Sequence, residues 1–163
     1  MKIVRAEAFV VDLETETIRF DAIQQFVKQD TIFVQLETED GLIGTGYSYT
    51  IGTGGRAIVA LLREDLLHRL IGQDARQVEG LWQKLFWATH GTAVGAITSL
   101  ALAAVDTALW DIRCKAAGQP LWLLAGGYRE RVPLYDTEGG WLNIEIDEIV
   151  TEAKNSVAKG WPG

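Results

Sequence analysis

The polar residues best placed for chemistry follow a short apolar segment near the carboxyl end of the sequence. Residues 132–136 are expected to form a strand, and Thr137, Gly139 and Gly140 lie in the connection after it. In parallel α/β proteins, sites are built at the carboxyl ends of strands. Thr137 is therefore a candidate substrate contact, although an ordinary strand-to-helix loop with a glycine turn explains these residues equally well.

The histidines and the cysteine do not have the spacing of a metal-ligand set. The sequence contains only His68 and His90, neither of them in an HxxxH or HExxH pattern, and Cys114 stands alone. Metal sites in proteins need three or four such ligands that converge. We interpret His68 as a surface or packing residue, His90 as a cation near a helix end, and Cys114 as an inert buried residue.

A glycine-rich segment, GTGGR at residues 52–56, precedes the first predicted helix. Backbone N–H groups at the start of a helix attract anions, so a carboxylate or a phosphate could bind there. The segment matches neither GxGxxG nor GxxxxGK[ST], the two common phosphate-binding patterns. A simple glycine-rich connection is therefore the preferred interpretation.

Two acidic residues lie in a mostly apolar segment with helical spacing. Asp106 and Asp111 are five residues apart, so they do not share a helix face. Lys115 follows Asp111 by four residues, which is the favourable order for an ion pair. Because buried carboxylates need partners, we expect structural ion pairs or caps rather than catalysis.

The composition is that of a folded, acidic protein. The 163 residues are 48% hydrophobic and 23% charged, with a formal net charge of −7. This charge argues against a nucleic-acid or anionic membrane surface, since phosphates are bound by clustered Lys and Arg. The first residues are charged and lack a secretion signal, so we expect a cytoplasmic protein. Residues 85–105 are uncharged, but their glycines and hydrogen-bonding side chains disfavour a membrane span.

The first third of the chain predicts a three-stranded antiparallel meander. Residues 2–12 and 31–38 alternate with the period of half-buried strands, and residues 42–49 return after a turn at Asp40 and Gly41. The residues expected to share one face of the first strand are Val4, Ala6, Ala8 and Val10. Residues 14–30 lose the alternation and are predicted to form a long loop.

The period then changes to that of amphipathic helices. The apolar residues of 58–69 fall on one helical stripe, and Gly72 follows that helix. Asp74 and Gln77 have the spacing of a capping box for a second helix, which Gly91 ends.

A long, mostly apolar helix is predicted over residues 93–117, because Gly118 and then Pro120 are helix-ending signals. The strand at residues 132–136 and a helix from Asp147 would follow. A single strand–helix unit cannot bury its strand. We therefore expect the chain to be incomplete or this unit to pack on something else.

Several segments together match one family pattern. They are EDGLIG at 39–44, ALAAVDTALWDI at 101–112, Lys115, GQPL at 118–121, Gly126-Gly127 and RVPLY at 131–135. In this spacing they resemble the mandelate racemase/muconate lactonizing enzyme branch of the enolase superfamily, and the resemblance covers the whole chain. Cys114 and Ala125 depart from the family's usual small residue and leucine without changing the resemblance.

The resemblance implies an α+β capping domain followed by the first βα unit of a truncated (β/α)8 TIM barrel. Residues 1–125 would be the N-terminal cap and residues 126–163 the incomplete beginning of the barrel. The family's catalytic lysines and metal carboxylates lie on later strands. We therefore assign no catalytic residue and no metal ligand, and give no role to Lys154 or Lys159.

The chemistry implied by the family is Mg²⁺-dependent removal of a proton beside a carboxylate, which forms an ene-diolate. We accordingly expect a racemase or dehydratase of a hydroxy-carboxylate, with the 163-residue chain inactive alone. The alternatives are a cycloisomerase of the muconate lactonizing type, an epimerase of the same superfamily, or a non-catalytic α+β module.

By the same resemblance, residues 14–30 and 47–55 would close over the barrel mouth and set specificity. Phe20, Tyr49 and Thr137 are the candidate substrate contacts. The expected partners are a small-molecule carboxylate and further copies of the chain in a homo-oligomer, with no nucleic acid and no membrane.

Overall fold

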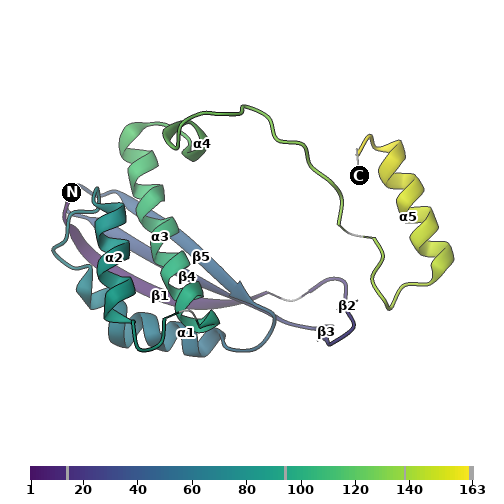
Figure 1. The fold of residues 1–163 in the computed structure, drawn as a ribbon, viewed down its shortest axis with the longest axis horizontal. Helices are drawn as coiled ribbons and strands as arrows, with labels where there is room; N and C mark the ends of the chain where they lie inside the picture. Colours follow the sequence, from purple (N-terminus) through teal and green to yellow (C-terminus); the bar gives the residue numbers. More distant parts are fainter. Residues whose placement is uncertain (14, 94, 138, 162–163) are drawn as a thin grey trace.

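An antiparallel sheet forms the centre of the computed structural model, which describes residues 1–13, 15–93, 95–137 and 139–161. Strand β4 (Gln29–Thr38) lies between β1 (Ile3–Leu13) and β5 (Ile43–Thr50), as Figure 1 shows. The turn from β4 to β5 contains Gly41 at a φ of 83°, which glycine adopts without strain. The predicted three-stranded meander is confirmed.

The helices cover one face of this sheet, and the apolar core lies between the two layers (Figure 1). Strand β4 contributes the fully buried Ile32 and Val34. Strand β5 instead presents Gly44 and Gly46, where a Cβ atom would overlap backbone carbonyls of helix α3 (Ala96–Ala117). These two glycines allow the helix backbone to lie directly on the strand.

The start of β1 differs from the sequence prediction. We expected Val4 on the same face as Ala8, but Val4 is 52% exposed, whereas Ile3 and Ala8 are buried. The register between β1 and β4 shifts between Ile3 and Arg5. Such an irregularity turns the first residue of the strand inward, which a strict alternation cannot reveal.

The predicted loop at residues 14–30 contains a second, small sheet. Strand β2 (Arg19–Phe20) pairs antiparallel with β3 (Gln25–Phe26). Between them, the carboxylate of Asp21 accepts two backbone N–H groups of the turn, at 2.7 Å each. The expectation of a loop without strands was therefore wrong, because an aspartate that closes its own turn builds a short hairpin.

The helix predicted over residues 58–69 changes its winding along its length. It consists of α1 (Gly55–Leu61), the π-helical η1 (Leu62–Leu66) and the 3-10 turn η2 (Leu67–Arg69). The apolar stripe is buried as the spacing predicted, and its fully buried members are Ile58, Leu62, Leu66 and Leu70.

Helix α2 (Val78–Ala88) does not begin with the predicted capping box. Asp74 forms an isolated bridge with Lys2, and its carboxylate accepts hydrogen bonds from the guanidinium of Arg76, the shortest at 2.6 Å. Gln77 is the N-cap, and the structure describes no side-chain hydrogen bond to that cap. The spacing of Asp74 and Gln77 did not predict the start of the helix correctly, because the carboxylate of Asp74 pairs with Arg76 instead of capping the helix.

Helix α3 is the long, mostly apolar helix that the sequence predicted, and it ends at Gly118 with a φ of 62°. The uncharged stretch at residues 85–105 is shared by the end of α2, a connection and the start of α3. Among the helices of the described ranges, none combines the length and the hydropathy needed to cross a membrane.

After the short α4 (Leu121–Leu124), which was not predicted, the chain leaves the sheet and helices as an extended segment that leads to α5 (Ile146–Ala158) (Figure 1). The strand predicted at residues 132–136 does not form, and Tyr135 is 73% exposed. A strand needs a hydrogen-bonded neighbour, and in the described part of the chain this segment has none.

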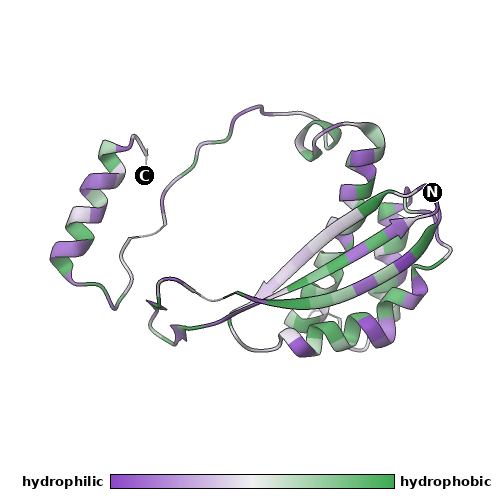
Figure 2. Cartoon of the chain, turned by 180° about the vertical axis from the view of Figure 1, so that it is seen from behind, coloured by the Kyte–Doolittle hydropathy of each residue, from purple (hydrophilic) through white to green (hydrophobic). Residues whose placement is uncertain are grey.

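Helix α5 is amphipathic and lies apart from the core. Figure 2 shows hydrophobic and hydrophilic residues alternating around it. Its apolar residues Ile146, Val150 and Val157 are exposed, and Ile149 is half-buried. An apolar stripe of this kind is normally covered by other protein.

Candidate functional site

The hairpin formed by β2 and β3 contacts residues that lie about 120 positions further along the sequence. The N–H of Phe20 donates to Oδ1 of Asn143 at 3.1 Å, and the N–H of Leu142 donates to the carbonyl of Phe20, also at 3.1 Å. The side-chain amide of Asn143 donates to the carbonyl of Ile18 at 2.9 Å. Asn143 thus uses both ends of its amide to hold one edge of the hairpin.

Trp141 adds an aromatic contact to the same hairpin. Its ring meets that of Phe26 edge to face with centroids 5.7 Å apart, and the guanidinium carbon of Arg19 lies 5.8 Å from its ring centre. Contacts of either kind contribute about 0.5–1.5 kcal/mol. The indole Nε1 is buried without a hydrogen-bond partner among the described residues. The ring contacts rather than the N–H therefore fix this residue.

The three predicted substrate residues lie in different parts of the structure. Phe20 is half-buried in β2, and Thr137 is exposed in the extended segment between α4 and α5. Tyr49 is 51% exposed and lies opposite Thr31, on the sheet face that the helices leave open. Within the described residues, no hydrogen bond or ring contact joins any two of these three side chains.

The sequence analysis missed Trp141 and Asn143 as site residues. Both lie in an irregular segment, and their partners in the hairpin are distant in the sequence. The only local sign was the neighbouring pair Gly139 and Gly140, the second of which has a φ of 82°. Glycine pairs indicate a defined turn, but they do not say what the turn contacts.

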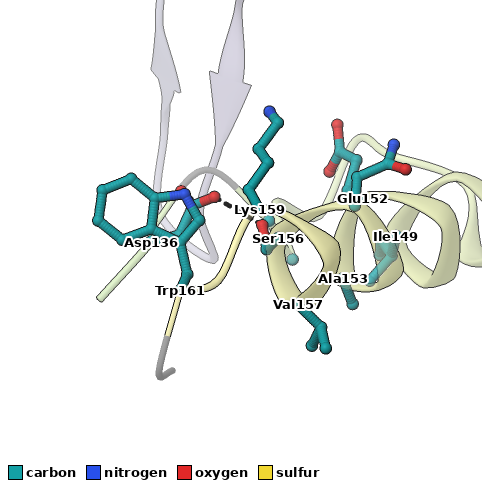
Figure 3. A pocket seen from close by; sticks show the side chains of 11 residues that line it. Asp136, Ile149, Glu152, Ala153, Ser156, Val157, Lys159 and Trp161 are labelled. Atoms are coloured by element: carbon teal, nitrogen blue, oxygen red, sulfur yellow. Dashed lines mark hydrogen bonds between the residues drawn. The ribbon is translucent and has the colours of Figure 1, made fainter. Parts of the chain in front are cut away.

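A cavity of about 590 Å³ lies between the segment around Asp136 and α5 (Figure 3). The carboxylate of Asp136 accepts a hydrogen bond from Oγ of Ser156 at 2.6 Å. Oε2 of Glu152 is buried and has no hydrogen-bond partner among the described residues. The rest of the lining includes apolar residues of α5 and Trp161, so this surface is better suited to packing against further protein than to catalysis.

The residues that the structure describes contain no group of three or more His, Cys, Asp or Glu side chains that could hold a metal ion. The Mg²⁺ implied by the sequence resemblance therefore has no ligand set in these residues. His68 and His90 are exposed. Cys114 is half-buried, less buried than we expected.

Asp111 forms the structural ion pair that the sequence predicted. Its Oδ2 accepts hydrogen bonds from Nζ of Lys115 at 2.7 Å and from the N–H of Thr45 at 2.8 Å. Lys115 also donates to the carbonyl of Ile43 at 2.7 Å. The pair therefore fastens α3 to β5.

Asp106 has no ion-pair partner among the described residues, so the same expectation was wrong for it. Asp106 lines a cavity of about 300 Å³ together with Trp82 and Phe86, whose rings stack 5.1 Å apart. Burial, and then the charge of Glu79, raise the pKa of Asp106 above its ordinary value.

Comparison with known proteins places this fold in a family. Residues 5–126 match the family model of the mandelate racemase/muconate lactonizing enzyme N-terminal domain. A 3,6-anhydro-alpha-L-galactonate cycloisomerase from Streptomyces coelicolor is 39% identical over 81% of this chain and 36% of the relative. An L-talarate/galactarate dehydratase from Salmonella typhimurium is 33% identical over 81% of this chain and 33% of the relative. The chain thus spans about a third of the length of these curated relatives.

Solved structures agree with the sequence comparison. A racemase from Streptomyces coelicolor with bound magnesium has a TM-score of 0.89 at 34% identity, over 97% of this chain and 44% of the other. The Salmonella typhimurium dehydratase liganded with Mg and L-lyxarohydroxamate has a TM-score of 0.90 at 28% identity, over 98% and 42%. From the match to the family domain and from the shared fold, this chain belongs to the mandelate racemase/muconate lactonizing enzyme family of the enolase superfamily.

Proposed function

We propose that this chain provides the specificity cap of a Mg²⁺-dependent racemase or dehydratase that removes the α-proton of a hydroxy-carboxylate. In this proposal residues 1–125 are the cap and residues 126–163 begin the barrel. The observation that carries it is the hydrogen-bonded contact of the β2–β3 hairpin with residues 142–143. This contact joins a cap segment to the loop that would follow the first barrel strand.

The ligands of related structures support the substrate class. An L-talarate dehydratase from Polaromonas sp. was solved with Mg and L-glucarate, a polyhydroxylated carboxylate. In the proposed enzyme, Phe20 and Tyr49 supply aromatic surface that contacts the acid and excludes water, and the hydroxyl of Thr137 binds a substrate oxygen. The superfamily uses a Lys or His base together with Mg²⁺. Neither the base nor the metal ligands are assigned to a described residue.

A cycloisomerase is the second candidate function. The observation in its favour is the 39% identity to the Streptomyces coelicolor cycloisomerase, which is higher than the 33% identity to the Salmonella typhimurium dehydratase. An epimerase of the superfamily remains a further alternative. The homo-oligomer and the cytoplasmic location stay predictions.

Exchange of the α-proton for deuterium tests the proposal. The full gene product, in deuterium oxide with Mg²⁺ and a panel of aldonic and aldaric acids, should exchange the α-proton of at least one acid. Phe20→Ala should raise KM about tenfold, equivalent to about 1.4 kcal/mol of lost apolar contact. Val4→Ala is the control, because Val4 is 52% exposed near the start of β1, at the end of that strand away from the hairpin, and it should leave kcat and KM unchanged.

Two results would count against the leading proposal in different ways. If no acid in the panel exchanges its α-proton, the racemase and dehydratase assignments both fail. If exchange yields a cyclised product instead of an inverted centre or loss of water, the cycloisomerase is the correct function.

A further inference from the structure

At one end of the main sheet, where β1 and β5 finish and β4 begins, a row of polar residues crosses the three strands. Asp12, Asp30 and Thr50 lie opposite one another in register on β1, β4 and β5. Two connecting segments, called the cap segments below, leave the sheet at this end (Figure 1). Residues 15–28 carry the β2–β3 hairpin between β1 and β4, and residues 51–54 lead from β5 to α1.

Asp30 lies at the centre of this row. Its side chain is 8% exposed, and its Oδ1 lies 2.8 Å from Nζ of Lys28. Thr50 donates a hydrogen bond to Oδ2 at 3.4 Å, and Asp12 lies 3.4 Å from the same ammonium group. The hydrogen bond from Lys28 is the main cause that lowers the pKa of Asp30. A carboxylate buried to this extent is stable only when it is paired, so the base of the hairpin depends on this contact.

Residues 51–55, which are the loop before α1 and the first residue of α1, pack against Lys28 and Asp30. A Cβ atom at Gly55 would lie 2.6 Å from Cβ of Asp30 and 2.8 Å from its Oδ2. A Cβ atom at Gly52, where φ is 79°, would lie 3.4 Å from the carbonyl oxygen of Lys28. The backbone of this loop therefore rests directly on Lys28 and Asp30, because its glycines carry no side chain at the contact.

We propose that Asp30 is a positioning residue that couples the two cap segments, holding the hairpin through Lys28 and the loop at residues 51–55 through Thr50 and direct packing. Asp30 itself contacts no substrate. The effect on substrate binding rests on the proposed function, whereas the coupling is a property of the fold. Weakening the contacts of the Asp30 carboxylate should therefore increase local opening of both segments.

Hydrogen exchange followed by mass spectrometry tests the coupling in the whole protein. Asp30→Asn should speed exchange about tenfold or more in peptides from both residues 18–28 and 51–55, because Lys28 loses its main partner. Exchange in α3 should not change, which separates local loosening from global unfolding. Asp40→Asn is the matched control, because Asp40 is exposed in the turn between β4 and β5 at the opposite end of the sheet, and it should change exchange in both segments by less than about twofold.

Faster exchange in only one segment, in neither segment, or to an equal extent in Asp40→Asn would overturn the proposal. If Asp30→Asn also loosens α3, Lys28→Met removes the other member of the pair from a more exposed position and carries the same expectation for both segments.

Kinetics separate the coupling from the proposed function. With its acid substrate, Asp30→Asn should raise KM while kcat stays nearly constant, as expected for a change in binding rather than in the reacting groups. Faster exchange in both segments with an unchanged KM would keep the coupling and reject the role of these segments as a specificity cap.

Discussion

At the scale of single residues, burial raises the pKa of two carboxylates, Asp30 and Asp106, and a cationic partner outweighs this effect at Asp30. Asp30 is paired with Lys28, and the hydrogen bond from Lys28 lowers its pKa. Asp106 has no cationic partner among the described residues, and burial raises its pKa. A charge that must be desolvated without a partner lowers the free energy of unfolding.

Asp106→Asn should stabilise the protein at pH 7 and have almost no effect near pH 3. The pKa of Asp106 is higher in the folded than in the unfolded state. Part of the free energy of unfolding that is present at low pH is therefore lost as the pH rises through the unfolded-state pKa and then the folded-state pKa. Asparagine keeps the shape without the charge. Thermal unfolding followed by circular dichroism should show a Tm rise of about 2 °C at pH 7.

Asp111→Asn is the comparison for this measurement, because it weakens the ion pair with Lys115 and should lower Tm at pH 7. An equal shift of Tm for Asp106→Asn at both pH values would show that the charge is not the cause.

At the scale of elements, the approach of α3 to β5 predicts opposite effects of one substitution at two glycines. Gly46→Ala would place a Cβ atom on the carbonyl of Ala104 and should lower the free energy of unfolding by about 1–3 kcal/mol. Gly80→Ala in α2 has its nearest neighbour at 3.8 Å and should raise it by about 0.5–1 kcal/mol. Urea unfolding measures both, and effects of the same sign would contradict the close approach.

The sequence predicted those elements whose pattern is regular over many residues. The meander and α3 could be predicted because alternation and helical spacing continue through them. The register shift near Ile3, the β2–β3 hairpin and the winding of η1 could not, because each interrupts a pattern within a few residues. Local hydrogen-bond geometry decides these interruptions, and periodicity carries little information about it.

The candidate site was less predictable than the fold. Phe20 could be named because the family resemblance places a cap loop there, and the structure brings its backbone into the contact with residues 142–143. Asn143 could not be named, since its partners Ile18 and Phe20 are distant in the sequence and a single asparagine has no pattern. Contacts between distant segments become visible only after the chain has folded.

At the scale of the whole molecule, the apolar core is confined to the first part of the chain. Every buried hydrophobic residue of the described core lies between Ile3 and Ile112, and α4 and α5 contribute none. This distribution supports the proposed boundary after Ala125. The apolar residues beyond it, including Val132 and Tyr135, are exposed.

A chain shortened to residues 1–125 should therefore fold alone, with a Tm within about 2 °C of the 163-residue chain. The longer chain should bind a hydrophobic dye through its exposed apolar residues, and the shortened chain should bind less. Calorimetry and dye fluorescence measure the two effects. A shortened chain without a cooperative transition would place the boundary elsewhere.

The confinement of the core also orders the events of biosynthesis. Ile112 leaves the ribosome before the extended segment and α5 leave it, and domains fold as units from the amino terminus. The sheet and its helices can therefore fold before Trp141 and Asn143 have left the ribosome. The hairpin gains its contacts with Trp141 and Asn143 only afterwards. During translation, the sheet and its helices therefore fold first, and the segment that binds the hairpin follows.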